Sequence, residues 1–428
     1  MVDKNLFLYD LAVVAIFKNE ARYLKEWLDY HLLAGVEHFY LYNNDSTDNY
    51  KEILAPYVEK NLVTLTEWSG KLMMYPAYND AIDKYRFDCR YMSFIDLDEF
   101  IFPKTNQNIV EVVDEILSGV PNAAGLGINW QCFGSNGQDN ADYSKGVLER
   151  FTRRAPKDWT LDGLGNIHVK TVNNPRMIDF IYNPHFAKYF EENFSVNENG
   201  GIIPSAFNNP VTAEKIVVNH YHVKSREEFS VKMQRGRADY KINTYDSAEF
   251  NSYDCNEEFD DGILKYREAR AKIYRQPDKS HAAENLLNAL MKNLSPTLLP
   301  NTPKDFYTGK FENFLTCCAV SSYLKKNLAE DTPAKFFEEA SLKAILKTLS
   351  NVMRLSDARL LIRNLPELLS LPYPAVKDLR TATLQVIFQM REIFHASNMW
   401  KDFVELDCLQ EMLNLRTCVH KRLSKVWI

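Results

Sequence analysis

Two carboxylates that could share a metal ion, Asp96 and Asp98, follow an apolar run over residues 91–95. The run holds aromatic and β-branched residues and ends abruptly, which predicts a buried strand. Side chains two residues apart on an extended chain point to the same face, so both carboxylates can reach one cation. Such oxygen ligands favour Mg²⁺ or Mn²⁺, ions that commonly join protein carboxylates to phosphates. The alternative is a solvated strand end or a cap of the next helix.

Alternating strand and helix patterns precede these carboxylates. The sequence predicts strands at 11–17, 38–42, 62–66 and 91–95, and helices that begin after 18–20, near 46 and near 75. Strands separated by helices of this length form right-handed crossovers and a parallel sheet. We therefore expect an α/β fold for this part of the chain.

Polar residues follow each of the four predicted strands. In open parallel sheets, ligands bind at the carboxyl ends of the strands. The polar clusters fall at those ends, at residues 18–20, 43–45, 67–68 and 96–98. Four such clusters predict a binding site along one edge of the sheet. Asp45 or Ser46 is also expected to cap the helix that runs to about Glu59.

The region from about 123 to 222 has a mixed pattern of short strands and polar loops. Within it, residues 217–223 predict another strand, with His220 and His222 on one face. A charged segment, residues 226–240, predicts a helix after that strand.

Near Pro277 the composition changes. Apolar residues recur at helical spacing and glycine nearly vanishes, which favours a helical region. We therefore expect two domains, an α/β domain over residues 1–275 and an all-α domain over residues 276–428.

Composition narrows the class of protein. The chain has 428 residues and a formal net charge of -6, which argues against general binding of nucleic acid. Its seven cysteines lack the spacing of a zinc site, so we expect reduced, mostly buried thiols in a cytosolic protein. The sequence shows neither a signal-peptide pattern nor an apolar stretch near the roughly 18 residues of a membrane span. We expect a cytoplasmic protein that at most contacts a membrane surface.

Motifs along residues 10–270 carry a family resemblance. They are Ala15–Glu20, Glu26–His31, Gly35–Asn44, Phe94–Phe100, Asn129-Trp130, Phe133–Ser135, Arg150-Phe151 and Asn219–His222. Together they resemble the nucleotide-diphospho-sugar glycosyltransferases of the GT-A fold, and more narrowly glycosyltransferase family 92 and its family 2-like bacterial relatives. The resemblance implies a Rossmann-like, mostly parallel GT-A domain, and it leaves the helical C-terminal region uncovered.

The resemblance also implies a metal site. In such enzymes the Asp-x-Asp carboxylates bind a divalent metal that bridges the donor's diphosphate, and a downstream histidine often joins them. Carried onto this chain, Mn²⁺ or Mg²⁺ would be held by Asp96 or Asp98, with Asp98 the more direct ligand, and by His220 or His222. The ion would stabilise the charge that develops on the leaving diphosphate. The alternative for the histidines is packing on a strand face with satisfied hydrogen bonds.

The donor nucleotide would contact the strand ends. The residues expected to do so are Phe17, Asn19, Glu20, Asn44, Asp45, Tyr78, Asn79, Asp96 and Arg154. Lys170 and Arg153 could also neutralise phosphate. The alternative for the residues at the strand ends is helix capping, which we prefer for Ser46 and Asp48.

An inverting transfer, which the resemblance implies, needs a carboxylate that deprotonates the acceptor hydroxyl. Glu149 lies where family 2-like relatives carry theirs, and Asp139 is the competing candidate. The alternative for Glu149 is an ion pair with Arg150 or Arg153. Further carboxylates stay open as candidates, namely Asp158, Asp162 and Asp239. Gln138 departs from the family pattern, where a histidine often follows Ser-x-Gly.

The sequence thus predicts a metal-dependent, inverting glycosyltransferase that moves a hexose from a nucleotide-diphosphate sugar, with a UDP-sugar as the default donor. The acceptor would be a glycan or a lipid-linked glycan in bacterial surface polysaccharide or lipopolysaccharide synthesis. The alternatives are a non-catalytic glycan- or nucleotide-binding protein on the same fold and a nucleotidyltransferase, which the absence of a glycine-rich loop after the first strand disfavours.

The last residues, 420–428, interleave basic with apolar side chains. Such a segment could lie on an anionic membrane beside a lipid-linked acceptor, or it could pack onto its own domain. Peripheral membrane contact and a homo-oligomer are both compatible with the sequence.

Overall fold

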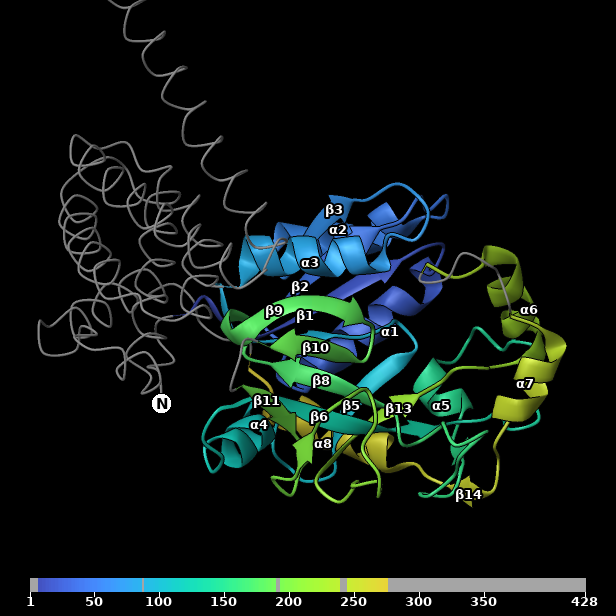
Figure 1. Ribbon diagram of the computed structural model, residues 1–428. Coiled ribbons are helices and arrows are strands. Elements are labelled where there is room, and N and C mark those ends of the chain that lie inside the picture. The colour runs from blue at the N-terminus through green and yellow to red at the C-terminus, as the bar shows by residue number, and fades with distance from the viewer. Residues whose placement is uncertain (1–6, 87, 190–192, 239–244, 276–428) are drawn as a thin grey trace, which may run out of the picture. The chain divides into compact units, whose positions relative to one another are not determined.

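The computed structural model describes residues 7–275, apart from 87, 190–192 and 239–244 (Figure 1). The chain divides into two compact units, Leu8–Lys279 and a second made of Met1–Phe7 with Ser280–Ile428. The predicted helical domain, 276–428, lies outside the described residues. Its all-α class and the boundary at residue 275 therefore stay predictions.

Strands and helices alternate along much of the described part of the chain. The strands are β1 (Tyr9–Phe17), β2 (His38–Asn43), β3 (Val63–Glu67), β4 (Cys89–Phe94), β5 (Glu99–Pro103), β6 (Ala123–Cys132), β7 (Arg153–Arg154), β8 (Val169–Asn173), β9 (Ile178–Asn183), β10 (Phe186–Tyr189), β11 (Phe194–Val196), β12 (Ile202–Ile203), β13 (Ile216–His220) and β14 (Glu258–Phe259). The helices are α1 (Ala21–Leu33), α2 (Tyr50–Glu59), α3 (Met74–Tyr85), α4 (Ile109–Leu117), α5 (Val147–Arg150), α6 (Arg226–Arg235), α7 (Ser247–Tyr253) and α8 (Gly262–Ile273), with a 3₁₀ turn η2 at Pro175–Met177.

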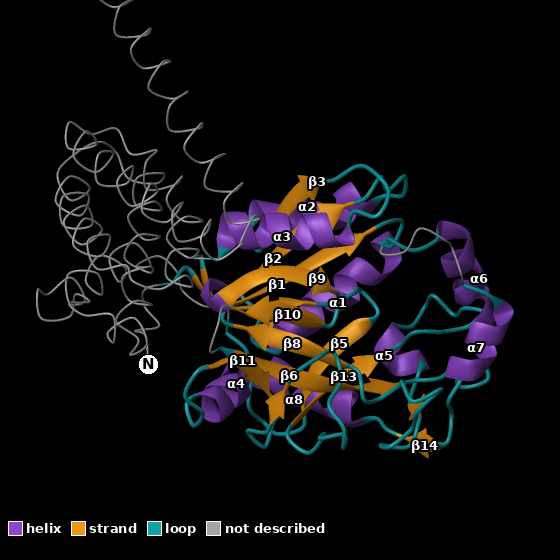
Figure 2. Ribbon diagram, in the orientation of Figure 1, coloured by secondary structure: helices purple, strands orange, loops and turns teal. Residues whose placement is uncertain are grey.

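The main sheet follows the order β12-β11-β6-β8-β4-β1-β2-β3 (Figure 2). Strands β3, β2, β1 and β4 run parallel and form a Rossmann-like half. Strand β8 then joins β4 and β6 in the antiparallel sense, while β6 pairs in parallel with β11 and β13. The predicted α/β class with a mostly parallel central sheet is confirmed, and so is the mixed pattern after residue 123.

Strand β1 lies at the centre of the core because both of its faces are apolar. Leu11, Val13, Ala15 and Phe17 belong to one buried cluster, and the residues between them belong to a second cluster. This alternation is the two-residue period of a strand. Helices α1, α2, α4 and α8 contribute to the first cluster, whereas α3 and the β9–β10 hairpin contribute to the second. The two helical layers therefore cover opposite faces of β1.

The predicted cap of α2 was wrong. Asn49 is the N-cap residue, and no side chain caps that helix end. The Asp45 carboxylate instead accepts a hydrogen bond from the Gly70 backbone N–H at 3.1 Å, and Ser46 Oγ accepts one from the Asn19 N–H at 2.9 Å. Both side chains are used to join neighbouring loops, so they are not available to the helix.

Two other elements are shorter than the sequence predicted. Strand β13 ends at His220, so His222 lies just beyond it. Helix α6 ends at Arg235, where Gly236 takes a positive φ of 83°. A left-handed residue ends a helix at low cost when it is glycine. Among the described residues, Cys89, Cys132 and Cys255 are buried, free thiols, as predicted.

Candidate active site

Hydrogen bonds hold together the loops that follow β1, β2 and β3. Asn19 accepts from the Thr47 N–H at 2.7 Å, and the Asp48 carboxylate accepts from the Ala21 N–H at 2.8 Å. Asn44 donates to the carbonyls of Trp68 and Gly70, each at 2.9 Å. Three strand ends are thereby fixed side by side, at the edge of the sheet where the sequence predicted a site.

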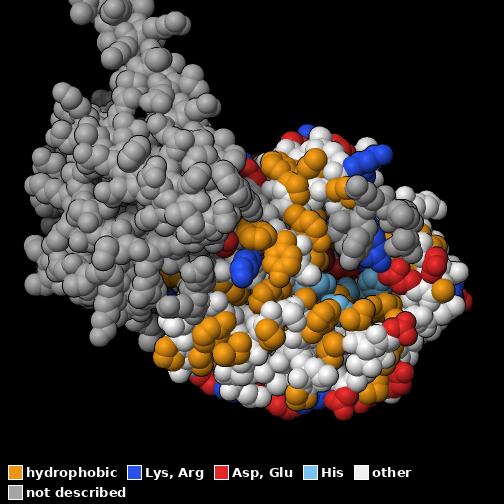
Figure 3. All heavy atoms as spheres, in the orientation of Figure 1, with side chains coloured by type: hydrophobic (Ala, Val, Ile, Leu, Met, Phe, Trp, Pro, Cys, Tyr) orange, Lys and Arg blue, Asp and Glu red, His pale blue; other side chains and the backbone are white. Residues whose placement is uncertain are grey.

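A cavity of about 530 Å³ opens at this edge. Its lining includes Phe17, Lys18, Glu20, Asn44, Lys71, Leu72, Met74, Asp96, Asp98, Trp130, His185, His220, His222, Lys232, Arg235, Arg237 and Tyr245. Figure 3 shows histidine side chains in this hollow, with acidic and basic side chains beside them. Seven of the residues predicted to bind the donor or the metal line the cavity, which are Phe17, Glu20, Asn44, Asp96, Asp98, His220 and His222.

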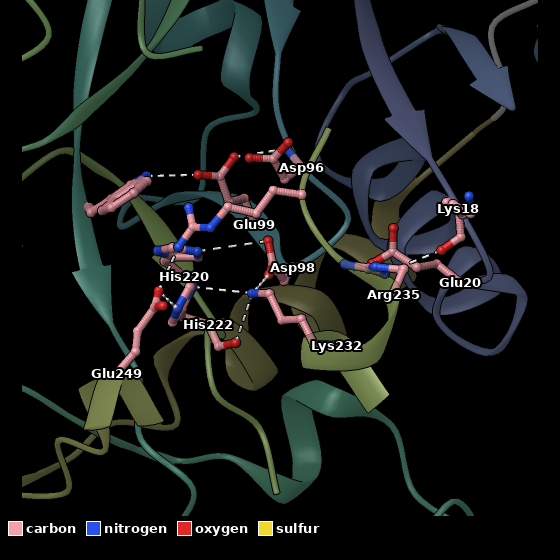
Figure 4. Close-up of polar contacts among 12 residues, drawn as sticks. Lys18, Glu20, Asp96, Asp98, Glu99, His220, His222, Lys232, Arg235 and Glu249 are labelled. Carbon is pink, nitrogen blue, oxygen red and sulfur yellow. Dashed lines mark hydrogen bonds and ion pairs between the residues drawn. The ribbon is translucent and has the colours of Figure 1, made fainter. Parts of the chain in front are cut away.

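The pairing of β5 with β13 brings Asp98 to the two histidines. Glu99 and His220 are partners in the antiparallel register, and the Tyr221 N–H donates to the Asp98 carbonyl at 2.8 Å. As a result, one ligand atom from each of Asp98, His220 and His222 lies within 4.8 Å of the others, and all three residues are buried. Figure 4 shows the three side chains converging.

This cluster fits a divalent metal. His222 Nε2 donates to the Glu249 carboxylate at 3.0 Å, the arrangement in which an acidic partner orients a ligating imidazole. His220 Nδ1 is buried and has no hydrogen-bond partner within the described residues. Burial holds the pKa values of both histidines well below their ordinary value, so both are neutral, as ligands must be. A carboxylate with two imidazoles is a ligand set that divalent transition metals bind.

Lys232 on α6 contacts the same cluster. Its Nζ donates to Asp98 Oδ2 at 2.9 Å, to His222 Nδ1 at 3.2 Å and to the His222 carbonyl at 3.0 Å. Burial would raise the pKa of Asp98, but Lys232, followed by Lys224, holds it well below the ordinary range. The carboxylate is therefore ionised, and the ammonium lies against the atoms that a cation would use.

Asp96 has a different partner from Asp98. Its carboxylate accepts from Lys170 Nζ at 3.0 Å, and Lys170 also pairs with Glu99 at 3.1 Å. Trp130 Nε1 donates to the other Glu99 oxygen at 2.8 Å. Lys170 is 1% exposed, so it cannot reach a phosphate as the sequence suggested, and it instead orients Asp96. The geometry thus gathers Asp98, and not Asp96, with the histidines.

Basic residues on and after α6 form one wall of the cavity. Arg235 pairs with Glu20 at 2.6 Å and donates to the Lys18 carbonyl, and Arg237 pairs with Glu249 at 2.8 Å. Sequence reasoning identified the charged segment without assigning these residues to the site. The recurrence of cations at 232, 235 and 237, in the predicted helical segment 226–240 that follows the two histidines, is the signal that could have found them.

Five predicted donor contacts lie outside the cavity lining. Asn19 and Asp45 bond the neighbouring loops. Tyr78 is buried against Phe94, and Asn79 bonds both backbone groups of Ile181 in β9. Arg154 is held by Asp260 at 2.8 Å. Each of these side chains packs against or bonds to another part of the protein.

The structure places both candidate bases at the surface. Glu149, 44% exposed, pairs with Arg267 at 2.9 Å, and Asp139, 80% exposed, pairs with Arg226 at 3.3 Å. The pairing of Glu149 with Arg150 or Arg153 does not form, since Arg150 binds Glu228 instead. Neither candidate lines the cavity, nor do Asp158 and Asp162, and Asp239 lies outside the described residues.

No described helix combines the length and apolar character that crossing a membrane requires.

Comparisons with known proteins identify the family of the chain. The family model described as Glycosyltransferase family 92 matches residues 13–257. A family 92 protein of Ricinus communis is 24% identical over 251 residues, which cover 58% of this chain and 41% of that protein. A galactan beta-1,4-galactosyltransferase of Arabidopsis thaliana is 30% identical over 100 residues, 21% of this chain and 19% of its own length. Among solved structures, S. aureus TarS 1–349 in complex with UDP has a TM-score of 0.30 and 13% identity over 79% of this chain and 89% of that one.

The chain spans about two fifths of the length of the Ricinus relative. The matched segment of the family model takes in more than half of this chain, from β1 to the end of the cavity wall, and includes Asp98, His220 and His222. The chain belongs to glycosyltransferase family 92.

Proposed function

We propose that this protein is a metal-dependent glycosyltransferase that moves a hexose from a nucleotide-diphosphate sugar to an acceptor. The observation that carries the proposal is the cluster of Asp98, His220 and His222 inside a 530 Å³ cavity at the strand ends. Membership of family 92 supports the reaction class. A non-catalytic protein on the same fold would be expected to lose the Asp-x-Asp carboxylates or the downstream histidine, and this chain retains both.

Asp98, His220 and His222 would hold Mn²⁺ or Mg²⁺. When bound, the ion neutralises the diphosphate and stabilises its charge as it leaves. Glu249 keeps the His222 ring in one orientation and one tautomer. Arg235 and Arg237 line the same cavity and add positive charge beside a diphosphate.

The donor's nucleoside would lie at the other end of the cavity. Phe17, Leu72 and Met74 offer apolar surface there, and Asn44 offers an amide. A uridine-diphosphate hexose remains our proposed donor, and the Arabidopsis galactosyltransferase supports galactose as the sugar. Inversion at the anomeric carbon is proposed from the family resemblance.

The acceptor would be a glycan or a lipid-linked glycan. The relatives reported above are plant proteins, so the bacterial surface pathway stays a prediction. Cytoplasmic location, peripheral membrane contact and a homo-oligomer are also proposals. The basic end at 420–428, which lies outside the described residues, motivates the membrane contact, and co-sedimentation with anionic liposomes tests it.

The proposal is tested by Asp98→Asn, which keeps the shape and removes the charge. We expect Mn²⁺ binding, measured by electron paramagnetic resonance, to be lost, and Mn²⁺-dependent hydrolysis of UDP-galactose to fall at least about 100-fold. Asp142→Asn is the matched control, because Asp142 is exposed and its carboxylate accepts hydrogen bonds from Ser144 in its own turn. Hydrolysis by Asp98→Asn at the wild-type rate in metal-free buffer would overturn the proposal.

A further inference from the structure

A second cavity, of about 260 Å³, adjoins the first. The two share Glu20, His222, Lys232 and Arg235, which therefore form the wall between them. The rest of the second lining comes from α1 and the residue two before it, from the loop before α5, and from α6 with the residues just before it. These residues are Asn19, Arg22, Tyr23, Tyr143, Val223, Lys224, Glu228, Val231 and Gln234.

The carboxylates that line the second cavity already have cations of their own. Glu20 pairs with Arg235, and Glu228 accepts two hydrogen bonds from Arg150, both at 2.8 Å. Lys232, also in the lining, pairs with Asp98 at 2.9 Å. Within the described residues, Arg22 and Lys224 are the cations of this cavity that form no ion pair.

Lys224 is the more informative of these two cations. It is 6% exposed, and the ion pairs found among the described residues do not include it, although the carboxylates of Asp98, Glu20 and Glu228 act on its charge from a distance. Its ammonium lies 4.8 Å from the centre of the Tyr23 ring, and its backbone has a positive φ of 54°. Lys224 Nζ is not among the buried polar atoms that lack a partner, so it is open to the cavity that the residue lines. A left-handed backbone at a lysine is unfavourable. An anion in the cavity would supply the missing acceptor.

Arg22 lies on the same side of the cavity. Its guanidinium is 4.2 Å from the centre of the Tyr143 ring, which orients it without neutralising it. The exposed Tyr143 ring could stack on a sugar, and the Arg22 guanidinium could pair with an anionic group. Together they suit a ligand that has both.

We propose that the second cavity binds the acceptor through a phosphate or carboxylate group, which Lys224 and Arg22 contact. This inference rests on the proposed function, since it assigns the acceptor class of the same site. The donor diphosphate already has the metal cluster and Lys232 in the first cavity, so the surplus of positive charge in the second is available to another ligand. The preferred acceptor is therefore an anionic glycan.

Titration calorimetry on the full-length protein tests this assignment. The probes are glucose 6-phosphate and glucuronate, which distinguish a phosphate from a carboxylate, with neutral glucose as the reference. We expect the wild type to bind one of the two anions at least about tenfold more tightly than glucose, the effect of one charge-assisted hydrogen bond. Lys224→Gln should remove that preference, Arg22→Gln should weaken it and Lys224→Arg should retain it.

Lys60→Gln is the matched control, because Lys60 is exposed and lines neither cavity. UDP binding in the presence of Mn²⁺ should fall less than binding of the sugar anion in Lys224→Gln, because Lys224 acts on Asp98 only from a distance. The assignment is overturned if the wild type shows no anion preference, if Lys60→Gln removes it equally, or if Lys224→Gln weakens UDP as much as the sugar anion. Failure of the wild type to bind UDP would instead overturn the proposed function, whatever the sugar anions do.

Discussion

The Lys232 ammonium contacts two of the three metal-ligand candidates, Asp98 and His222. A divalent ion and this ammonium would compete for Asp98 Oδ2 and His222 Nδ1. We expect Lys232→Met, which keeps the length of the side chain without its charge, to bind Mn²⁺ more tightly, by about tenfold or more. Electron paramagnetic resonance of added Mn²⁺ measures the affinity directly.

The same variant should bind UDP more weakly at saturating Mn²⁺, because Lys232 lines the donor cavity. Arg226→Met is a suitable control, since Arg226 lies on the same helix but contacts Asp139 at the surface. Unchanged Mn²⁺ affinity in Lys232→Met would show that the ammonium and the ion do not share a position.

Glu149, the catalytic base predicted from the sequence, can be tested by substitution. Its carboxylate pairs with Arg267 outside the cavity lining, so the geometry predicts that Glu149→Gln keeps transfer activity within about twofold. Asp139→Asn should behave in the same way, as an exposed ion pair contributes little. A fall of roughly 10²–10⁴-fold in kcat with unchanged donor binding would instead support the base assignment made from the sequence.

Site residues could be predicted from the sequence where a polar or acidic side chain directly follows a predicted strand. Asp98, Glu20 and Asn44 were found in this way, and all three line the cavity. Lys170 was misjudged because nothing in its local sequence reveals that two buried carboxylates, Asp96 and Glu99, surround its ammonium. Such pairing depends on contacts between distant strands, which a local pattern does not contain.

At the scale of elements, helix α6 is anchored by a buried ion pair. Arg150 and Glu228 are 3% and 1% exposed and form two hydrogen bonds of 2.8 Å, while Ser225 and Glu228 form the capping box of the helix. Arg150→Met leaves the carboxylate buried and unpaired, which typically costs about 3–5 kcal/mol. We expect the free energy of unfolding, measured in urea, to fall by that amount.

Arg267→Gln is the matched control, because it removes an arginine from a half-exposed pair and should cost no more than about 1 kcal/mol. UDP binding should also weaken in Arg150→Met, since α6 carries Lys232 and Arg235 into the cavity. A stability equal to that of Arg267→Gln would contradict the anchoring role.

The periodic elements were readily predicted, for a physical reason. Strand β1 is apolar on both faces, and α1 places Leu24, Trp27 and Leu28 on one buried side. Because buried positions need apolar side chains, the spacing of apolar residues in the sequence reveals both elements. The β5–β13 pairing was not predicted, although each strand is apolar. Partner choice and register between strands so far apart in sequence follow from the packing of the whole sheet.

At the scale of the whole molecule, buried neutral histidines set the response to acid. His31 Nδ1 donates to the Trp27 carbonyl at 2.8 Å, and its Nε2 accepts from the Ile101 N–H at 3.3 Å, which fits one neutral tautomer. Burial lowers the pKa of His31 to about 3 and that of His38 to about 4. The unfolded chain binds these protons near pH 6.5.

The folded state therefore binds fewer protons than the unfolded state below pH 6.5. The contribution of His31 to stability is complete above that pH and is lost as the pH falls towards 3. As the pH falls from 6.5 towards 3, the free energy of unfolding in urea should decrease less steeply in His31→Gln than in the wild type. The two slopes should differ by about 1.4 kcal/mol per pH unit in this range and by little above pH 7. Equal slopes for the two proteins between pH 6 and pH 4 would contradict this expectation.

The β5–β13 ladder also determines when the site can exist during synthesis and folding. Asp98 leaves the ribosome long before His220 and His222, and until β13 has docked beside β5 the carboxylate has no imidazole near it. Contacts between residues so distant in sequence form late, because a long loop must close first. If the cluster binds Mn²⁺ as proposed, affinity for the ion is acquired in the step that completes the sheet, and partly folded chains would not sequester it.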